Sequence, residues 1–120
     1  MTLKECYQAM GADYDDVLGR LRSERLIQKF MLKFLDDGSY ELLCESMSSG
    51  NLEDAFRASH TIKGVCQNLG FSKLGASSHD LTEALRAGDG AGAAALLGGV
   101  QADYEQTVSA IRAFKAEAGL

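Results

Sequence analysis

The chain contains two histidines, and the residues around one of them, His60, have types and spacings that could do chemistry. Three later residues share its side of a helix, at offsets of three, four and seven positions: Lys63, Gly64 and Gln67. An exposed imidazole is largely neutral near pH 7, and its free ring nitrogen is a nucleophile toward phosphorus. The lysine would supply positive charge to phosphoryl oxygens, and the glycine would leave room for an incoming group. The spacing therefore indicates phosphoryl chemistry on His60.

A helical wheel places this histidine away from the apolar face of its segment. At about 100° per residue, the apolar side centres on Ala55, Ile62 and Cys66, and His60 lies roughly 140° from that centre. A surface histidine with a lysine three residues later is common by chance. A glycine inside a helix costs about 1 kcal/mol, however, so Gly64 beside the histidine strengthens the functional interpretation.

The segments that must position these residues all have helical patterns. The 120 residues include no proline, and no stretch alternates strictly enough to predict a strand. An apolar stripe at helical spacing runs from Leu26 to Met47 and is interrupted at Gly38. This pattern predicts one long helix over residues 23–49 that is kinked or briefly broken at residues 37–39.

Three further helices follow this one. Asn51 is a suitable N-cap for a helix that Gly70 ends, and Ser72 is expected to cap the next. The first is predicted over residues 51–69, the second from residue 72 to an end at residues 87–90, and the third over about residues 91–118. Because the connections are only two to four residues long, consecutive helices must pack as antiparallel neighbours.

The N-terminal residues predict two short helices. Thr2 can cap the first, with Glu5 as its capping-box partner, and both helices are expected to lie at the periphery. The predicted fold is thus all-α, an up-and-down antiparallel four-helix bundle over residues 23–118 with a short N-terminal helical cap over residues 1–22. A chain of this length is expected to form a single domain, residues 1–120.

The charge balance excludes one class of partner. The chain has 17 acidic and 12 basic side chains, a formal net charge of -5, and a pI near 4.9. Nucleic-acid binding needs clustered Lys and Arg to neutralise phosphates, so we expect no nucleic-acid partner. No apolar run approaches the roughly 20 residues that span a bilayer, and residues 1–11 lack the features of a signal peptide. We therefore expect a cytoplasmic protein that does not contact a membrane.

The three cysteines, Cys6, Cys44 and Cys66, follow no CxxC or Cys/His spacing. This usage fits a reducing compartment in which each thiol behaves as a small buried hydrophobe. A zinc site made of His60, His79 and Cys66 is disfavoured, because Cys66 faces inward on the wheel while His60 faces outward and the sequence suggests no fourth ligand. We expect neither a metal nor a cofactor.

The segment from His60 to Gly70, HTIKGVCQNLG, resembles the HxxKGxxxxxG signature of histidine-containing phosphotransfer (HPt) domains. The resemblance extends over roughly residues 24–116. It implies a four-helix bundle whose exposed histidine accepts a phosphoryl group from the aspartyl phosphate of one receiver domain and passes it to another.

The resemblance also implies a role for each residue at the motif. His60 would be the phospho-acceptor and Lys63 an electrostatic stabiliser. Gly64 would provide clearance, and Gln67 would be a polar flank of the site, although ordinary solvated surface explains this glutamine about equally well.

Three further residues are supporting candidates: His79, Thr82 and Arg57, the last one turn before the acceptor. Many relatives place Glu or Gln at the Thr82 position to hold the acceptor ring. The shorter threonine departs from that pattern, so ring orientation would fall to a water, to Glu83 or to His79. The wheel puts His79 and Thr82 toward the outer side of their helix, and His79 matches a histidine of chemotaxis-kinase phosphotransfer domains. A solvated surface histidine is the alternative for His79.

These residues are compatible with three functions. The first is a phosphorelay carrier with no kinase or ATPase activity of its own, because no nucleotide-binding loop is present. Its partners would be response-regulator receiver domains and a sensor or hybrid histidine kinase, and we expect a monomer.

The second is the N-terminal phosphotransfer domain of a chemotaxis-type or hybrid histidine kinase. The run over residues 57–64 and His79 favour it, whereas no linker rich in Pro, Ser or Gly follows the last predicted helix. The third is a non-phosphorylated helical docking module that binds a partner through the face around Phe56 and Phe71.

Overall fold

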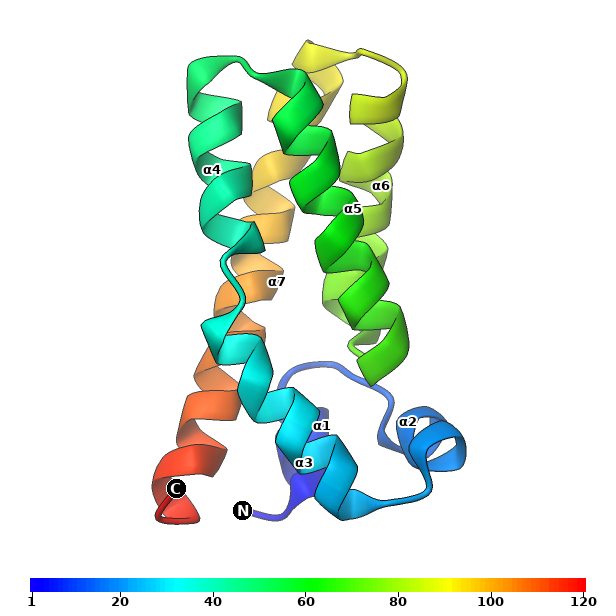
Figure 1. The fold of residues 1–120 in the computed structure, drawn as a ribbon, viewed down its shortest axis with the longest axis vertical. Helices are drawn as coiled ribbons and strands as arrows, with labels where there is room; N and C mark the ends of the chain where they lie inside the picture. The colour runs from blue at the N-terminus through cyan, green and yellow to red at the C-terminus, as the bar shows by residue number, and fades with distance from the viewer.

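The computed structural model describes residues 1–120, and every regular element in it is helical (Figure 1). The prediction of an all-α chain is confirmed. In chain order the elements are α1 (Leu3–Ala9), α2 (Tyr14–Leu21), α3 (Glu24–Lys33), the short 3-10 helix η1 (Phe34–Asp36), α4 (Ser39–Ser49), α5 (Leu52–Leu69), α6 (Ser72–Arg86) and α7 (Gly90–Glu117).

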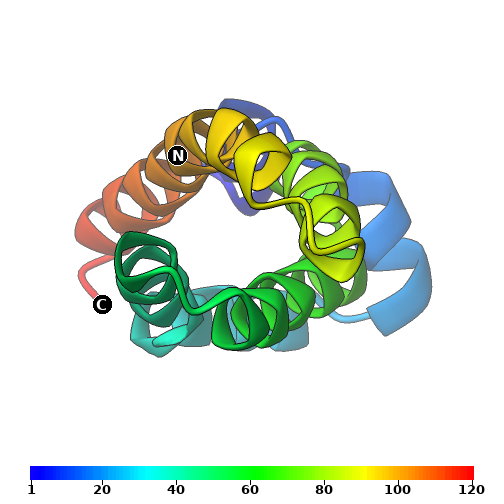
Figure 2. The same cartoon turned by 90° about the horizontal axis from the view of Figure 1, so that it is seen from above.

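Four of these helices, α4 to α7, run side by side around a shared apolar interior. Seen from above, they form a ring in which α5 lies between α4 and α6, and α7 follows α6 (Figure 2). Side chains bridge α4 and α7. The rings of Tyr40 and Tyr104 stack with centroids 3.6 Å apart, and the Gln101 amide donates to the sulfur of Cys44 over 3.8 Å.

The predicted interruption near residues 37–39 is confirmed as a break between two helices. After η1 the backbone turns extended at Asp37, and Asp37 Oδ1 accepts a hydrogen bond from the Ser39 backbone N–H at 2.8 Å. Because the helix is interrupted here, α3 departs from the line of α4 and lies near α1 and α2 at the lower end of the molecule (Figure 1).

The caps of α5 follow the sequence prediction, whereas the cap of α6 does not. The Asn51 side chain accepts from the Asp54 backbone N–H at 3.1 Å, and Gly70 ends α5 in the left-handed conformation at φ 71°. Ser72 is the first residue of α6, so the prediction that it caps this helix is wrong. The N-cap is Phe71, which has no side-chain cap bond; the Ser72 hydroxyl instead donates to the Gly70 carbonyl at 3.3 Å.

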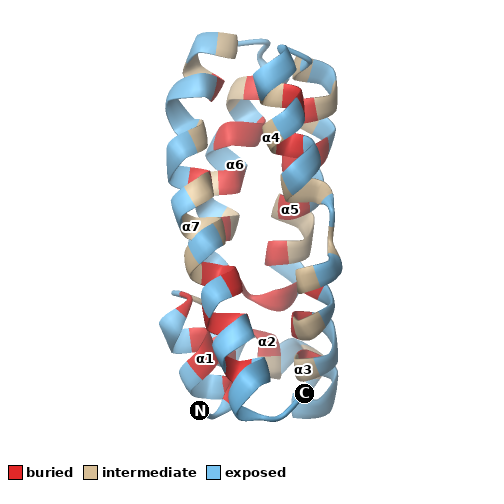
Figure 3. Ribbon diagram, turned by 90° about the vertical axis from the view of Figure 1, so that its left-hand side faces the viewer, coloured by how far each residue is buried: buried red, intermediate tan, exposed pale blue.

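The N-terminal segment contributes to the core, so the expectation that it lies at the periphery is wrong. The predicted capping box between Thr2 and Glu5 is present. Six apolar side chains of the segment are buried and belong to the same 25-residue core cluster as the long helices (Figure 3): Leu3, Cys6, Tyr7, Met10, Tyr14 and Val17. A helix of seven or eight residues has little stability of its own, so this burial is what holds α1 and α2 in place.

The same segment caps the C-terminal end of α5. The last carbonyls of a helix have no partner within the helix, and here three consecutive ones accept bonds from residues far earlier in the chain. The Arg20 guanidinium donates to Asn68 O at 2.9 Å, the Tyr7 hydroxyl to Leu69 O at 2.7 Å, and the Asp13 backbone N–H to Gly70 O at 2.8 Å. The end of α5 is therefore held by α1, α2 and the turn between them.

All three cysteines are free thiols. Cys6 and Cys66 are buried as predicted, and Cys44 is only half-buried. Burial raises the pKa of Cys6 to about 11 and that of Cys66 to about 12, so both remain protonated near neutral pH. None of the helices is both long and apolar enough to cross a membrane.

Candidate functional site

His60 lies on the outer side of α5, as the helical wheel predicts. The opposite side of this helix is buried, and its inward residues are Ala55, Ala58, Ser59, Ile62, Cys66 and Leu69. The side chain of His60 is exposed and forms no hydrogen bond or ion pair within the chain. Both ring nitrogens are therefore free to meet a group brought by another molecule.

One aromatic contact does restrain the imidazole. The rings of Phe56 and His60 are nearly parallel, with an interplanar angle of 10° and centroids 5.7 Å apart. The guanidinium carbon of Arg86, at the end of α6, lies 5.0 Å from the Phe56 centroid. Arg86 also pairs with Glu83, with Nε and Oε1 3.5 Å apart. The His60 ring thus belongs to a small cluster built from two helices.

Lys63 and Gly64 lie on the turn of α5 that follows His60. Lys63 is half-buried and takes part in no ion pair, so its ammonium group is available to an anion. A methyl group added at Gly64 would meet nothing within 4 Å outside its own helix. No internal contact therefore requires the glycine, and the space beside the histidine is open.

Thr82 corrects one sequence-based expectation. It was expected toward the outer side of its helix together with His79, but it is fully buried. Its hydroxyl donates to Ser78 O at 2.6 Å and lies 3.0 Å from the hydroxyl oxygen of Ser59. The reason is the antiparallel pairing of α5 and α6, which sets Thr82 against the inward side of α5. Thr82 is consequently not available to orient the His60 ring.

His79 is exposed as expected, and the structure brings it near Gln67 rather than into the His60 cluster. Both side chains line a hollow of about 460 Å³ between α5 and α6, together with Asp16 and Asp80. No hydrogen bond joins His79 to His60. The two sequence candidates Gln67 and His79 therefore form one polar surface toward the C-terminal end of α5.

Arg57 is exposed and engaged toward the start of α5. Its guanidinium lies 2.5 Å from a Glu53 carboxylate oxygen and 3.5 Å from an oxygen of Asp54. These ion pairs direct the arginine away from Lys63 and Gly64. Exposed pairs of this kind contribute little to stability, so a bound anion could still displace them.

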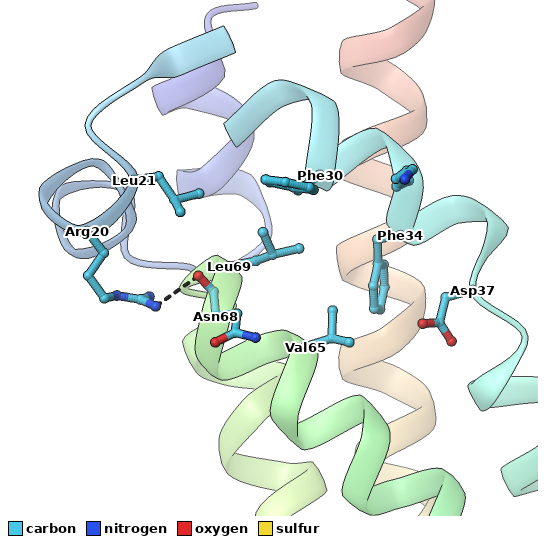
Figure 4. A pocket seen from close by; sticks show the side chains of 9 residues that line it. Arg20, Leu21, Phe30, Phe34, Asp37, Val65, Asn68 and Leu69 are labelled. Atoms are coloured by element: carbon cyan, nitrogen blue, oxygen red, sulfur yellow. Dashed lines mark hydrogen bonds between the residues drawn. The ribbon is translucent and has the colours of Figure 1, made fainter. Parts of the chain in front are cut away.

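A second cavity, of about 410 Å³, lies at the junction of α2, α3, η1 and α5 (Figure 4). Phe30 and Phe34 contribute apolar lining, and the dashed line in Figure 4 marks the bond from Arg20 to Asn68. Neither His60 nor Lys63 lines this cavity. The cavity is thus separate from the histidine cluster.

The predicted docking face around Phe56 and Phe71 does not exist as one surface. Phe56 is partly exposed, but Phe71 is only 1% exposed and packs its ring against Phe34 and Tyr7.

The chain also contains no group of three or more His, Cys, Asp or Glu side chains that could hold a metal ion.

The family model described as Hpt domain matches residues 7–113, and the chain belongs to that family. Hpt domains are phosphocarrier modules rather than enzymes by themselves, and they serve histidine phosphotransfer in two-component signalling. They interact with receiver domains and histidine kinases. Comparison with curated proteins and with solved structures gives no match.

Two members of the cluster, Phe56 and Arg86, were not among the predicted site residues. Phe56 was named only in the predicted docking face, although a spacing of four residues places it beside His60 on the same helix. Arg86 is 26 positions further along the chain, and only the pairing of α5 with α6 brings it to Phe56. The sequence carries no local signal for that contact.

Proposed function

We propose that the chain is a histidine phosphotransfer protein of a two-component phosphorelay, with His60 as the residue that carries the phosphoryl group. The observation that supports this most directly is the arrangement on the outer side of α5. An exposed imidazole without internal partners is followed by an unpaired ammonium group at Lys63 and by open space at Gly64. The chain belongs to the Hpt domain family, and its other exposed histidine, His79, does not have this setting.

The transfer step needs only one nucleophile from this chain. The lone pair of the unprotonated ring nitrogen of His60 attacks phosphorus and forms a P–N bond, while the P–O bond to the receiver aspartate breaks. The aspartate carboxylate leaves with the electron pair of that bond, and the other ring nitrogen keeps its proton. Transfer to the next receiver is the reverse of this step.

The neighbouring residues adjust the charge and the space around the reacting phosphorus. Negative charge is spread over three equatorial phosphoryl oxygens during transfer, and we assign Lys63 to offset part of it. Gly64 keeps the approach path clear for the receiver. Gln67 forms a polar flank with His79, and Arg57 supports the N-terminal side of the site.

The architecture proposed from the sequence can be stated in terms of the observed helices. The broken pair α3 and α4 is one interrupted helix, which with α5, α6 and α7 makes an up-and-down four-helix bundle. Residues 1–22 are its N-terminal cap, and residues 1–120 form one domain. We propose a cytoplasmic location, because the three free thiols fit a reducing compartment. We also propose that the domain is a monomer.

The proposed partners are response-regulator receiver domains and a sensor or hybrid histidine kinase. The formal net charge of -5 does not favour nucleic acid as a partner. We assign no kinase or ATPase activity, and neither a cofactor nor a metal, to this chain.

A second candidate is the phosphotransfer domain of a chemotaxis-type or hybrid kinase, favoured by the exposed His79 beside Gln67. The donor separates the two proposals. A carrier in a relay takes its phosphoryl group from a phosphorylated receiver, whereas a kinase-borne domain takes it from a kinase module with ATP.

The test is transfer from receiver domains of the same genome that have been phosphorylated with acetyl phosphate. We expect acid-labile, base-stable phosphate on the wild-type chain and none on His60→Gln, with the free energy of unfolding changed by less than about 0.5 kcal/mol because His60 is exposed. His79→Gln is the matched control and should retain the label. Labelling of His60→Gln would contradict the assignment, and absence of label on the wild-type chain with every receiver would overturn the proposed function.

A further inference from the structure

We propose that Phe56 is a positioning residue for His60, whose aromatic ring fixes the plane in which the acceptor imidazole stands. The inference rests on the proposed function of His60 and adds a residue that the sequence motif does not contain. It answers a question that the buried Thr82 leaves open, namely what orients an imidazole that has no hydrogen-bond partner.

The ring of a histidine is poorly constrained by its own torsions. Rotation about the Cβ–Cγ bond has broad minima, so an exposed imidazole without a partner samples a wide range of orientations. Phe56 lies one turn earlier on α5, and the two ring planes differ by 10° at a centroid separation of 5.7 Å. This is the geometry of an offset-stacked pair, an arrangement that aromatic rings prefer over a face-to-face sandwich. The stack therefore favours orientations of His60 parallel to the Phe56 ring.

The phenylalanine is itself held in place, which is what a platform requires. Phe56 packs partly against the apolar core, and the Arg86 guanidinium carbon lies 5.0 Å from its ring centroid. Arg86 is in turn paired with Glu83 at 3.5 Å. Side chains from both α5 and α6 thus restrain the Phe56 ring.

None of the α6 residues considered for orienting the ring, Thr82, Glu83 and His79, forms a hydrogen bond with His60, and Glu83 is paired with Arg86. Thr82 is fully buried, and its hydroxyl is engaged with Ser78 and Ser59. The stack selects the plane of the ring. A half-turn about the Cβ–Cγ bond preserves that plane, so Phe56 determines how the ring stands rather than which of its edges faces the receiver.

The experiment compares Phe56→Leu, which keeps an apolar side chain without a ring, with Phe56→Tyr, which keeps the ring. Misplacing a reacting group lowers the rate of a positioned reaction. We expect transfer from a phosphorylated receiver to be about three- to tenfold slower in Phe56→Leu and within about twofold of wild type in Phe56→Tyr. Phe30→Leu is the matched control, because Phe30 is also partly exposed but lies on α3, away from His60.

A second measurement reports on the ring directly. Carbon-13 relaxation at His60 Cε1 should show a restrained ring in the wild-type chain and in Phe56→Tyr, and a more mobile ring in Phe56→Leu. A freely moving ring in the wild type would overturn the proposal even if Phe56→Leu failed to fold. Wild-type transfer and unchanged relaxation in a folded Phe56→Leu would overturn it as well. Either result leaves the proposed function intact if His60→Gln remains unlabelled, whereas labelling of His60→Gln would refute that function itself.

Discussion

The two halves of α5 are held in different ways. Around His60, in the middle of the helix, the outer side chains are exposed or half-buried, and the imidazole ring has one aromatic neighbour. At the C-terminal end, three carbonyls are capped by the N-terminal segment, and the following Phe71 is enclosed by Phe34 and Tyr7. Contacts that stabilise the fold are concentrated where no phosphoryl chemistry is proposed. Mutations at the two places should therefore separate stability from transfer.

The largest effect is expected from Phe71→Ala. Removing an aromatic side chain that is 1% exposed leaves a cavity against Phe34 and Tyr7, and such changes cost about 3–5 kcal/mol in the free energy of unfolding. Denaturant unfolding measures the loss, and transfer to the fraction that remains folded should be unchanged. A slower transfer per folded molecule would show that the two parts of α5 are coupled.

Lys63→Ala should have the opposite profile. Receivers bring positive groups of their own to the same phosphoryl oxygens, so losing this ammonium should raise the barrier by about 1–2 kcal/mol, roughly ten- to thirtyfold in rate. Rapid-quench transfer from a phosphorylated receiver measures the change, while the free energy of unfolding should stay within about 0.5 kcal/mol. If Lys63→Ala is as inactive as His60→Gln, the lysine is required for docking and does not share the charge with other groups.

A smaller change is expected at the capped end, from Tyr7→Phe. The variant keeps the ring and its contact with Phe71 but removes the hydroxyl that donates to Leu69 O at 2.7 Å. Leaving this buried carbonyl without its donor should cost about 1 kcal/mol of stability and leave transfer unchanged. Thermal or denaturant unfolding beside the wild type checks this, and equal stability would mean that water replaces the tyrosine.

The smallest effect is expected from His79→Gln. His79 is exposed and joined to Gln67 only through a shared hollow, so its removal should slow transfer by no more than about two- to threefold, which is within about 1 kcal/mol. The same rapid-quench assay decides the matter. A wild-type rate for His79→Gln would show that His79 is an ordinary solvated surface residue. A decrease in the transfer rate of more than tenfold would show that it is part of the site.

The helices and the exposure of His60 could be predicted because both follow from local periodicity. Bulky apolar residues such as Ile62 define the inward face of α5 without ambiguity, and the histidine opposite them must face solvent. The break near Gly38 could be predicted for the same reason, since a glycine there interrupts the stripe.

The errors arose where tertiary contacts decide the environment. On α6 the buried face includes Leu81 and Ser78, and at about 100° per residue Thr82 lies roughly 70° from the centre of these two, against roughly 130° for His79. The wheel placed Thr82 toward the outer side of the helix, but the hydroxyl of Ser59 provides a buried partner for it. That partner belongs to another helix, and the sequence around Thr82 contains no signal that predicts it.

The short N-terminal helices were misplaced for a related reason. Helices this short have little intrinsic stability, so the segment considered alone is expected to add little to the core. Gly70 closely approaches Asp13, and a methyl group added at Gly70 would lie 2.8 Å from the Asp13 carbonyl oxygen. This contact and the burial of Tyr7 both depend on residues more than 50 positions apart. Such packing is visible only in the folded chain.

The three bonds that cap α5 also constrain how this protein can be divided or recombined. A shortened version that starts at α3 would expose the carbonyls of Asn68, Leu69 and Gly70 together, along with the apolar surface that α1 and α2 cover. A chimera that takes its histidine helix from one parent and its first 22 residues from another would have to match donors to carbonyls across the join. The N-terminal segment and the end of α5 therefore form one structural unit, and they should be exchanged together in a chimera.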